Sequence, residues 1–281
     1  MKPLLAKHKA LKDYILFILM FIVALIIVLP LIWLFSASLQ GLSGISRTPF
    51  RWIPSEFQFV NFVNVWKQGN LGNAFLSSVC ASSLYIVFHL FFCTITGFIF
   101  AKYNFRFKNP LFLFIIITMM VPAEITYFPV YGIMRTLNLI DTFPGIVLPS
   151  LLSGFGIFFM RQFATYIPNE LIESAKIDGA GNFRIFIQIA VPLLKAAIAA
   201  LSILAFTYVW NDYAWPSLVI NSDNMRTLPV TLASLSSSQF RLINYNEVIA
   251  GGVIALSPVL ILFLFFQKQF IESVTSSGIK G

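Results

Sequence analysis

Six long apolar segments follow one another along the 281 residues of the chain, and they limit what it can fold into. A helix needs about 20 apolar residues to cross the hydrocarbon core of a membrane. Only 11% of the residues are charged, against about 25% in a typical soluble domain, so lipid is the main solvent. Because a helix satisfies its own backbone hydrogen bonds in lipid, we expect an all-α membrane protein, a single transmembrane domain over 1–281. The expected spans are 14–39, 75–101, 111–134, 143–163, 193–213 and 248–270.

Prolines lie inside several of these spans, at Pro30, Pro122, Pro129, Pro149 and Pro258. A proline frees backbone groups of its helix, and in lipid these groups must be satisfied by neighbouring helices or by water in a cavity. The prolines therefore predict kinked helices that pack against one another or around a water-filled cavity.

The basic residues indicate the orientation, because Lys and Arg collect in cytoplasmic connections. With the N-terminus inside, 13 of the 19 Lys and Arg residues fall in inner segments and six in outer ones. The six outer residues are Arg47, Arg51, Lys67, Arg135, Arg226 and Arg241. This bias places both termini in the cytoplasm and accounts for the net charge of +8 without a nucleic-acid partner.

A polar, charged stretch, 164–192, lies on the inner side between the fourth and fifth spans. Pro168 suits the first position of a helix, and the carboxylates of Glu170 and Glu173 in the first turns favour the helix dipole. Gly179 is expected to end this helix, and a second short helix should follow. The stretch could float on lipid headgroups as an amphipathic helix. Such helices are usually rich in Lys and Arg, however, and two leading glutamates fit a protein socket better.

The spacing within this stretch carries a motif. Glu173-Ser174-Ala175 is followed after three residues by Gly179 and after nine more by Ile189-Ala190-Val191-Pro192. The pattern resembles the EAA signature in the membrane subunits of ATP-binding-cassette (ABC) importers. That signature reads Glu-Ala-Ala, three residues, Gly, nine residues, Ile, any residue, Leu-Pro, so this chain departs from it at Ser174 and Val191.

Three further segments are similar to the carbohydrate branch of that family: Asp178-Gly179-Ala180, Arg226-Thr227-Leu228-Pro229 and Ser277-Gly278-Ile279-Lys280-Gly281. Over its whole length the chain resembles the second permease subunit of maltose-type systems.

This resemblance implies the type I ABC importer fold, six transmembrane helices with a cytoplasmic coupling helix that docks in a groove of an ATPase subunit. It implies four kinds of partner: a pair of ATPase subunits that bind ATP and Mg, a second homologous permease, an extracytoplasmic solute-binding protein, and a sugar. It also implies the bacterial cytoplasmic membrane as location. The residues to which it assigns the coupling role are Glu170, Glu173, Ala175, Asp178, Gly179 and Ala180.

The sequence predicts no catalysis and no cofactor in this chain. It lacks a G-x-x-x-x-G-K-[ST] phosphate loop, and it has no nucleophile–base or paired-carboxylate arrangement. Cys80 and Cys93 read as core thiols without metal-ligand spacing. His89 is expected to be a packed polar residue, with a proton relay as the alternative.

Two groups of polar and aromatic residues are candidates for the substrate path. Helical spacing puts one group, near the end of the fifth span, on a single face. For Trp210 and Trp215, an aromatic belt at the outer headgroups is the alternative. A second face, in the third span, could line the cavity. Alternatively, it lies at the outer rim, where Glu124 would pair with a base such as Arg135. The first group is Tyr208, Asn211, Asp212 and Trp215. The second is Glu124, Tyr127 and Tyr131.

Two other classes of function compete with an importer permease. A secondary transporter driven by an ion gradient often shows internal repeats with paired broken helices, and no such repeat is visible in this chain. A membrane scaffold without transport activity is the third possibility. Dependence of uptake on ATP separates the first two, and co-purification with an ATPase excludes the third.

Overall fold

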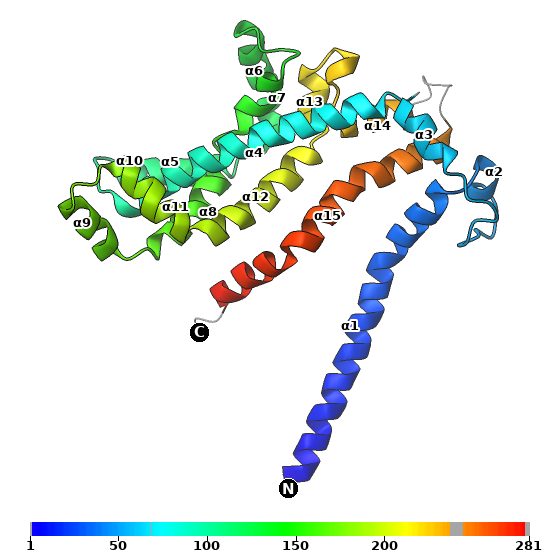
Figure 1. The fold of residues 1–281 in the computed structure, drawn as a ribbon, viewed down its shortest axis with the longest axis horizontal. Helices are drawn as coiled ribbons and strands as arrows, with labels where there is room; N and C mark the ends of the chain where they lie inside the picture. The colour runs from blue at the N-terminus through cyan, green and yellow to red at the C-terminus, as the bar shows by residue number, and fades with distance from the viewer. Residues whose placement is uncertain (1, 68, 237–243, 279–281) are drawn as a thin grey trace. The chain divides into compact units, whose positions relative to one another are not determined.

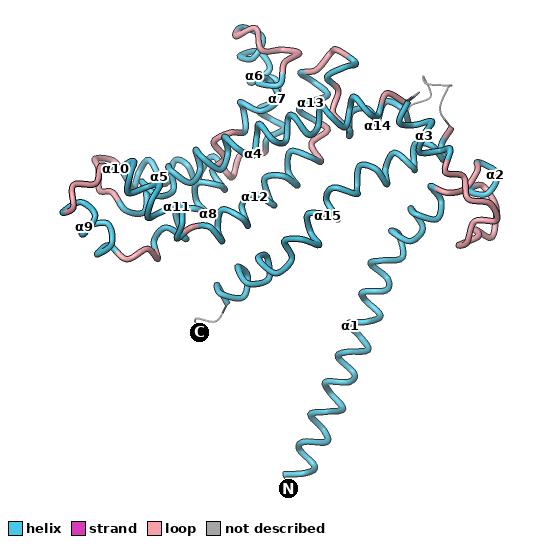
Figure 2. Tube along the Cα trace, viewed as in Figure 1, coloured by secondary structure: helices cyan, strands magenta, loops and turns pink. Residues whose placement is uncertain are grey.

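The computed structural model describes residues 2–67, 69–236 and 244–278, and within these ranges the chain is helical and contains no strand (Figures 1 and 2). Arg241 and the end of the C-terminal motif, Ile279-Lys280-Gly281, lie outside these ranges. Three helices are long and unbroken: α1(Lys2–Ser38), α4(Leu71–Lys102) and α15(Tyr245–Gly278). The shorter helices are α2(Leu42–Ile45), α3(Val60–Lys67), α5(Lys108–Thr118), α6(Ala123–Thr136), α7(Phe143–Val147), α8(Gly154–Thr165), α9(Asn169–Ile177), α10(Asn182–Ile185), α11(Val191–Leu193), α12(Lys195–Trp210), α13(Ala214–Val219) and α14(Leu228–Ser236). Single turns are η1(Leu148–Ser150), η2(Phe186–Ala190) and η3(Asp223–Met225).

The chain divides into two compact units, Met1–Leu71 with Ser234–Leu256 and Gly72–Ala233 with Ser257–Gly281. In the first unit, every residue of α1 from Lys12 to Pro30 is exposed. An apolar helix with this much exposure needs lipid or another protein around it.

A buried polar network holds the first unit together. Asn61 of α3 donates to the carbonyl of Ser38 at 2.9 Å and accepts from the amide of Asn246 at 2.7 Å. Asn64, one helical turn later, donates to Glu247 at 2.7 Å. Since Glu247 is buried and satisfied by these bonds, it has a structural role at the start of α15.

The second unit is built around α4. At its Lys102 end, aromatic and aliphatic side chains of α4, α5, α8 and α12 form one core cluster, which includes Phe98, Phe112 and Met160. Nearer the start of α4, a second cluster joins it to α6, α7, α12 and α13 through residues such as Tyr85 and Trp215.

Three of the six expected spans are broken helices. The angle between the two halves is 103° for α5 and α6, 54° for α7–η1 and α8, and 80° for residues 182–193 and α12. Three helices are long and apolar enough to cross a membrane alone, and six spans result if each bent pair counts as one. The exact boundaries of the spans stay a prediction.

The prolines account for only part of these breaks. Pro122 immediately precedes α6. The break falls at this point because a proline disfavours helical geometry in the residue before it. Pro30, Pro129 and Pro258, in contrast, lie inside helices that continue past them. A proline in a span therefore does not by itself tell where the helix will break.

A hydrogen-bonded carboxylate ties two loops together. Asp141 accepts from the backbone N–H groups of Asn221 and Ser222, each at 3.0 Å, and from the Ser222 hydroxyl. The bonds from Ser222 lower the pKa of Asp141. The tie is therefore complete at neutral pH and is lost as the pH falls through this lowered pKa.

Helices α4 and α8 cross at Gly97 with their backbones close together. A Cβ atom at this position would lie 2.7 Å from the backbone nitrogen of Arg161 and 2.7 Å from Cβ of Met160. Backbone atoms of a packed helix cannot move aside as a flexible side chain can, so this crossing requires glycine.

We expect Gly97→Ala to destabilise the protein by about 1–3 kcal/mol, the usual cost of overpacking a core. The measurement is the midpoint of thermal unfolding of the purified protein in detergent. Gly132→Ala is the control, because the space around Gly132 is open and alanine in a helix is more favourable than glycine by about 0.5–1 kcal/mol. Equal midpoints for the two variants would show that the crossing tolerates a side chain.

Candidate functional site

The charged stretch 164–192 folds into two short helices joined by a tight turn. Helix α9 begins one residue after Pro168, which precedes it with φ −60° and is not its first residue as predicted. Glu170 in its first turn and Lys176 in its last turn both favour the helix dipole. Gly179 follows with φ +81°, in the left-handed region where glycine ends helices.

One side of this loop is buried and the other is open. Ile172, Ile185 and Phe186 are buried in the core cluster, where Phe186 contacts the ring of Phe98 in α4. Ala175 and Ala180 are half-buried against the same cluster. The exposed side, called the docking face below, combines carboxylates with apolar groups: Glu170, Leu171, Glu173, Ile177, Asp178 and Phe183. Gly179 is exposed beside it, with open space where a Cβ atom would lie.

The loop is fastened to the end of α4 by two neighbouring side chains. The ammonium group of Lys102 donates to the carbonyls of Thr165 and Ile167, at 3.0 and 2.5 Å, and to the amide oxygen of Asn169 at 3.0 Å. These acceptors lie at the end of α8 and the start of α9, where helices leave backbone groups unsatisfied.

Tyr103 makes the second attachment. Its hydroxyl donates to the amide oxygen of Asn182 at 3.2 Å, and the ammonium group of Lys176 lies 5.2 Å from the centre of its ring. Burial raises the pKa of Tyr103, which keeps the hydroxyl a neutral donor. Tyr103, the residue that follows α4, therefore contacts both short helices of the loop.

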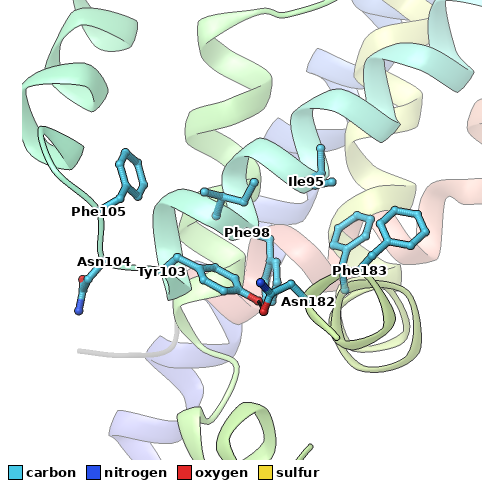
Figure 3. A pocket seen from close by; sticks show the side chains of 9 residues that line it. Ile95, Phe98, Tyr103, Asn104, Phe105, Asn182 and Phe183 are labelled. Atoms are coloured by element: carbon cyan, nitrogen blue, oxygen red, sulfur yellow. Dashed lines mark hydrogen bonds between the residues drawn. The ribbon is translucent and has the colours of Figure 1, made fainter. Parts of the chain in front are cut away.

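A mostly apolar cavity of about 540 Å³ lies where the loop meets α4. Figure 3 shows Ile95, Phe98 and Tyr103 on the α4 side and Asn182 and Phe183 on the α10 side.

The loop continues directly into α12. The turn η2 is a π-helix of five residues, a form that often marks functional sites. Pro192 follows in α11, and at Leu194 the chain bends by 80° into α12. The loop is therefore joined to α12 by one short, bent connection.

The predicted face of the fifth span does not exist as one helical surface. Helix α12 ends at Trp210, Asn211 follows as its cap, and Trp215 belongs to α13. A carboxylate oxygen of Asp212 accepts from the backbone N–H of Trp215 at 3.3 Å. Such side-chain bonds to the backbone compete with continued helix, and Pro216 cannot supply a helical N–H.

The structure nevertheless brings most of these residues together with those of the third span. The Trp215 ring is buried, contacts Tyr127 of α6 with ring centres 5.8 Å apart, and donates from Nε1 to the carbonyl of Gly145 at 3.1 Å. Trp210 is also buried. Their burial inside the chain does not fit rings exposed to headgroups in an aromatic belt.

Two carboxylates belong to the same group. Asp212 follows Tyr208 by four residues and accepts from the backbone of Trp215, and Glu124 lies in the first turn of α6, three residues before Tyr127. Together with Trp215, these four residues form what we call the acid–aromatic cluster. Among the described residues Glu124 forms no ion pair, so the predicted partner Arg135 does not bind it.

The other two predicted path residues lie beside this cluster. Tyr131 packs with Tyr127 on the second core cluster, as their shared helical face predicts. Asn211 is exposed and donates back to the carbonyl of Thr207 at 2.8 Å.

Sequence reasoning missed Tyr85 of α4 and its stacking with His89. Tyr85 and His89 are buried, stack with ring centres 4.7 Å apart, and extend to Tyr208, whose ring lies 6.0 Å from that of Tyr85. His89 Nδ1 bonds the carbonyl of Leu151 at 3.0 Å, so the expectation of a packed polar residue agrees with its surroundings. Their spacing of four on one helical face was the available signal.

Comparisons with known proteins define the family. The family model described as the inner membrane component of binding-protein-dependent transport systems matches residues 93–276. The arabinooligosaccharide permease AraQ of Halalkalibacterium halodurans is 36% identical over 262 residues, 92% of this chain and 93% of that protein.

The chain belongs to this family of transport-system inner membrane components. Its relatives include AraQ of Bacillus subtilis, 38% identical over 81% of both chains, and the sn-glycerol-3-phosphate permease UgpE of Yersinia pestis, 30% identical over 92% of this chain and 95% of that one. The crystal structure of a bacterial ABC transporter that imports the acidic polysaccharide alginate matches the fold with a TM-score of 0.80. It covers 90% of this chain and 94% of that chain at 24% identity.

Membership of this family confirms the all-α permease fold and a multi-pass protein of the inner membrane. It also makes the chain an importer permease and not an enzyme. The alternatives of a secondary transporter and a scaffold do not agree with it.

We expect Lys102→Met to loosen the loop 164–192, because it removes the donor shared by three acceptors. Hydrogen exchange of the backbone amides in 166–172 should rise at least fivefold, which corresponds to about 1 kcal/mol. Lys195→Met is the control, since Lys195 is exposed and lies in α12 outside these contacts. Unchanged exchange in Lys102→Met would show that the core cluster alone holds the loop.

Proposed function

We propose that this chain forms half of the translocation path of a sugar importer and that its loop 164–192 transmits the work of a separate ATPase. The observation that carries the proposal is the docking face. It is an acidic and apolar surface held rigidly on a buried base and joined through one bend to α12.

The chemistry of the docking face supports a protein partner. Acidic groups would be repelled by anionic headgroups, whereas exposed apolar groups beside charged ones are typical of a protein interface. Glu170, Glu173, Asp178 and Gly179 lie on or beside this face, and we assign docking to them. Ala175 and Ala180 support the loop from below.

We further propose that two ATPase subunits bind ATP and Mg, and that this chain binds neither. A second, homologous permease completes the path, and an extracytoplasmic binding protein delivers the sugar. The partners named for relatives and the binding-protein-dependent family support this arrangement.

Sugar as the substrate is supported by the relatives. Their names include arabinooligosaccharides, sn-glycerol 3-phosphate and alginate. The path of this chain would include the acid–aromatic cluster with Tyr131 and Asn211. Both termini, and the docking face, would lie in the cytoplasm.

The whole importer tests this function. When the two permeases, the ATPase pair and the binding protein are reconstituted in vesicles, sugar uptake should require ATP hydrolysis on the docking-face side. It should continue after an uncoupler collapses the proton gradient. Uptake that stops with the uncoupler while ATP is present would instead support transport driven by an ion gradient.

The orientation has its own measurement. Lys176→Cys should react with a membrane-impermeant maleimide only after cells are opened, because Lys176 is exposed on the loop. Labelling in intact cells would place the loop outside and contradict the coupling role.

We expect Gly179→Val to uncouple transport while the importer still assembles. Valine is strained at φ +81° by about 1–2 kcal/mol, so the turn between α9 and α10 should change shape although the space around it is open. Uptake should fall at least tenfold and basal ATP hydrolysis should persist. Gly181→Val is the matched control, because Gly181 has φ −68° and open space. Gly179→Asn, which tolerates the left-handed region, should retain most uptake.

Glu173→Lys should have the same effect for a different reason. It reverses one charge at the centre of the docking face and should weaken retention of the ATPase on the purified permease. Normal uptake and ATPase retention in this variant, at normal expression, would contradict the assignment.

A further inference from the structure

A second cavity lies in the interior of the second unit and differs from the one beside the loop. It has a volume of about 360 Å³, which is large enough for a sugar ring. Its walls come from α4, from the break between α7 and α8, and from α12. The lining residues are Tyr85, His89, Ser150, Ser153, Phe155, Leu201, Leu204, Ala205 and Tyr208.

One wall of the cavity is an aromatic surface. Tyr85 and His89 stack almost parallel, with an angle of 21° between their planes, and Tyr208 continues the surface from α12. The electron-rich face of an aromatic ring attracts the partly positive C–H groups on the face of a sugar ring. Tyr208 is 52% exposed, so part of its ring is open to a bound molecule.

Ser150 and Ser153, at the break between α7 and α8, also line the cavity. The chain is not α-helical between η1 and Gly154, and the Ser153 hydroxyl caps α8 by accepting from Gly156 N–H at 2.9 Å. Non-helical backbone at membrane depth is tolerated where protein buries it or where it lines a watery cavity. Binding sites in other transporters are built at such discontinuous helices.

The polar atoms of His89 have partners within the protein. Nδ1 donates to the carbonyl of Leu151 at 3.0 Å and Nε2 lies 3.8 Å from Cys93 Sγ, so His89 contributes the face of its ring to the wall. The hydroxyls of Ser150 and Tyr208 can donate and accept. Sugar hydroxyls also do both, so they match such groups without any full charge.

The electrostatics argue against an anionic substrate. No Lys or Arg lines the cavity. In a low-dielectric site, a phosphate or uronate would find no cation to replace its water.

We propose that Tyr85, His89 and Tyr208 form a binding subsite for an uncharged sugar ring within the path, and that this path disfavours anionic sugars. The inference rests on the proposed function and narrows its substrate class. It separates substrates that the names of similar proteins leave together: the uncharged arabinooligosaccharides on one side, and the anionic polyol phosphate sn-glycerol 3-phosphate and the anionic polysaccharide alginate on the other.

The first experiment measures substrate class with the complete importer in vesicles. Arabinotriose, xylotriose and maltotriose are the uncharged probes, and sn-glycerol 3-phosphate and alginate pentasaccharide are the anionic ones. Binding of each to the cognate binding protein is measured alongside its ATP-dependent uptake. We expect uptake of at least one uncharged probe, at ten times or more the rate of either anionic probe.

Comparable or faster uptake of an anionic probe would overturn the inference and leave the importer function intact. Failure of every probe to be taken up, with all subunits assembled and hydrolysing ATP, would instead overturn the proposed sugar function. The two failures are therefore distinguishable.

The second experiment tests the subsite itself with Tyr208, which is exposed enough to change without breaking the core. Tyr208→Leu should lower uptake of the transported probe at least tenfold, and it should lower probe-stimulated ATP hydrolysis while basal hydrolysis stays normal. Tyr208→Phe keeps the ring and should lose less, about twofold to fivefold. Tyr213→Leu is the matched control, because Tyr213 is 50% exposed and lies outside the cavity. Equal uptake in Tyr208→Leu and Tyr213→Leu would show that the sugar does not touch this surface.

Discussion

The second unit depends on one constraint: helices that break inside a membrane must have their freed backbone groups satisfied. In this unit the unbroken helix α4 supplies many of the partners. His89 bonds the carbonyl of Leu151 between η1 and α8, and Tyr85 reaches that of Ser150 at 3.5 Å. Near its start, Ser78 accepts from the N–H of Leu228 at 2.7 Å, and at its end Lys102 covers the carbonyls before α9. The polar residues of α4 therefore allow its neighbours to be bent.

This role explains why α4 shows no clear polar face in the sequence. Its polar side chains point toward several partners along 32 residues, so they do not gather on one stripe. The positions of these polar side chains along α4 depend on where the neighbouring helices break. Hydropathy finds α4 as a span, but the pattern that makes it the centre of the unit depends on residues more than 60 positions away, such as Leu151 and Thr165.

The sequence predicted the helical class, the number of apolar segments and the helix–turn–helix of the loop, because these follow from local patterns. Gly179 was identifiable from its place after a short helix, and it does adopt the left-handed conformation. The bends were less predictable. Pro129 and Pro258 look like Pro122 in the sequence. Helices α6 and α15 nevertheless continue past Pro129 and Pro258, whereas Pro122 stands at a break. The single helical face expected over 208–215 is absent from the structure. Helix α12 ends at Trp210, and Asp212 accepts a hydrogen bond from the backbone N–H three residues ahead.

Two fixed points now limit how the loop could act on the path. The Gly97 crossing holds α8 against α4 through backbone contact, while at the end of α4 Lys102 holds the start of the loop and Tyr103 holds α10. Helix α12 is attached differently: it follows a π-turn and an 80° bend, and it contacts α4 through side chains such as Tyr208 on Tyr85. Side-chain contacts can slide, whereas a backbone crossing at glycine cannot. A pull on the docking face would therefore move α12 along α4 more readily than it would separate α8 from α4. The same movement would change the distance between Tyr208 and Tyr85, which links the loop to the aromatic wall of the interior cavity.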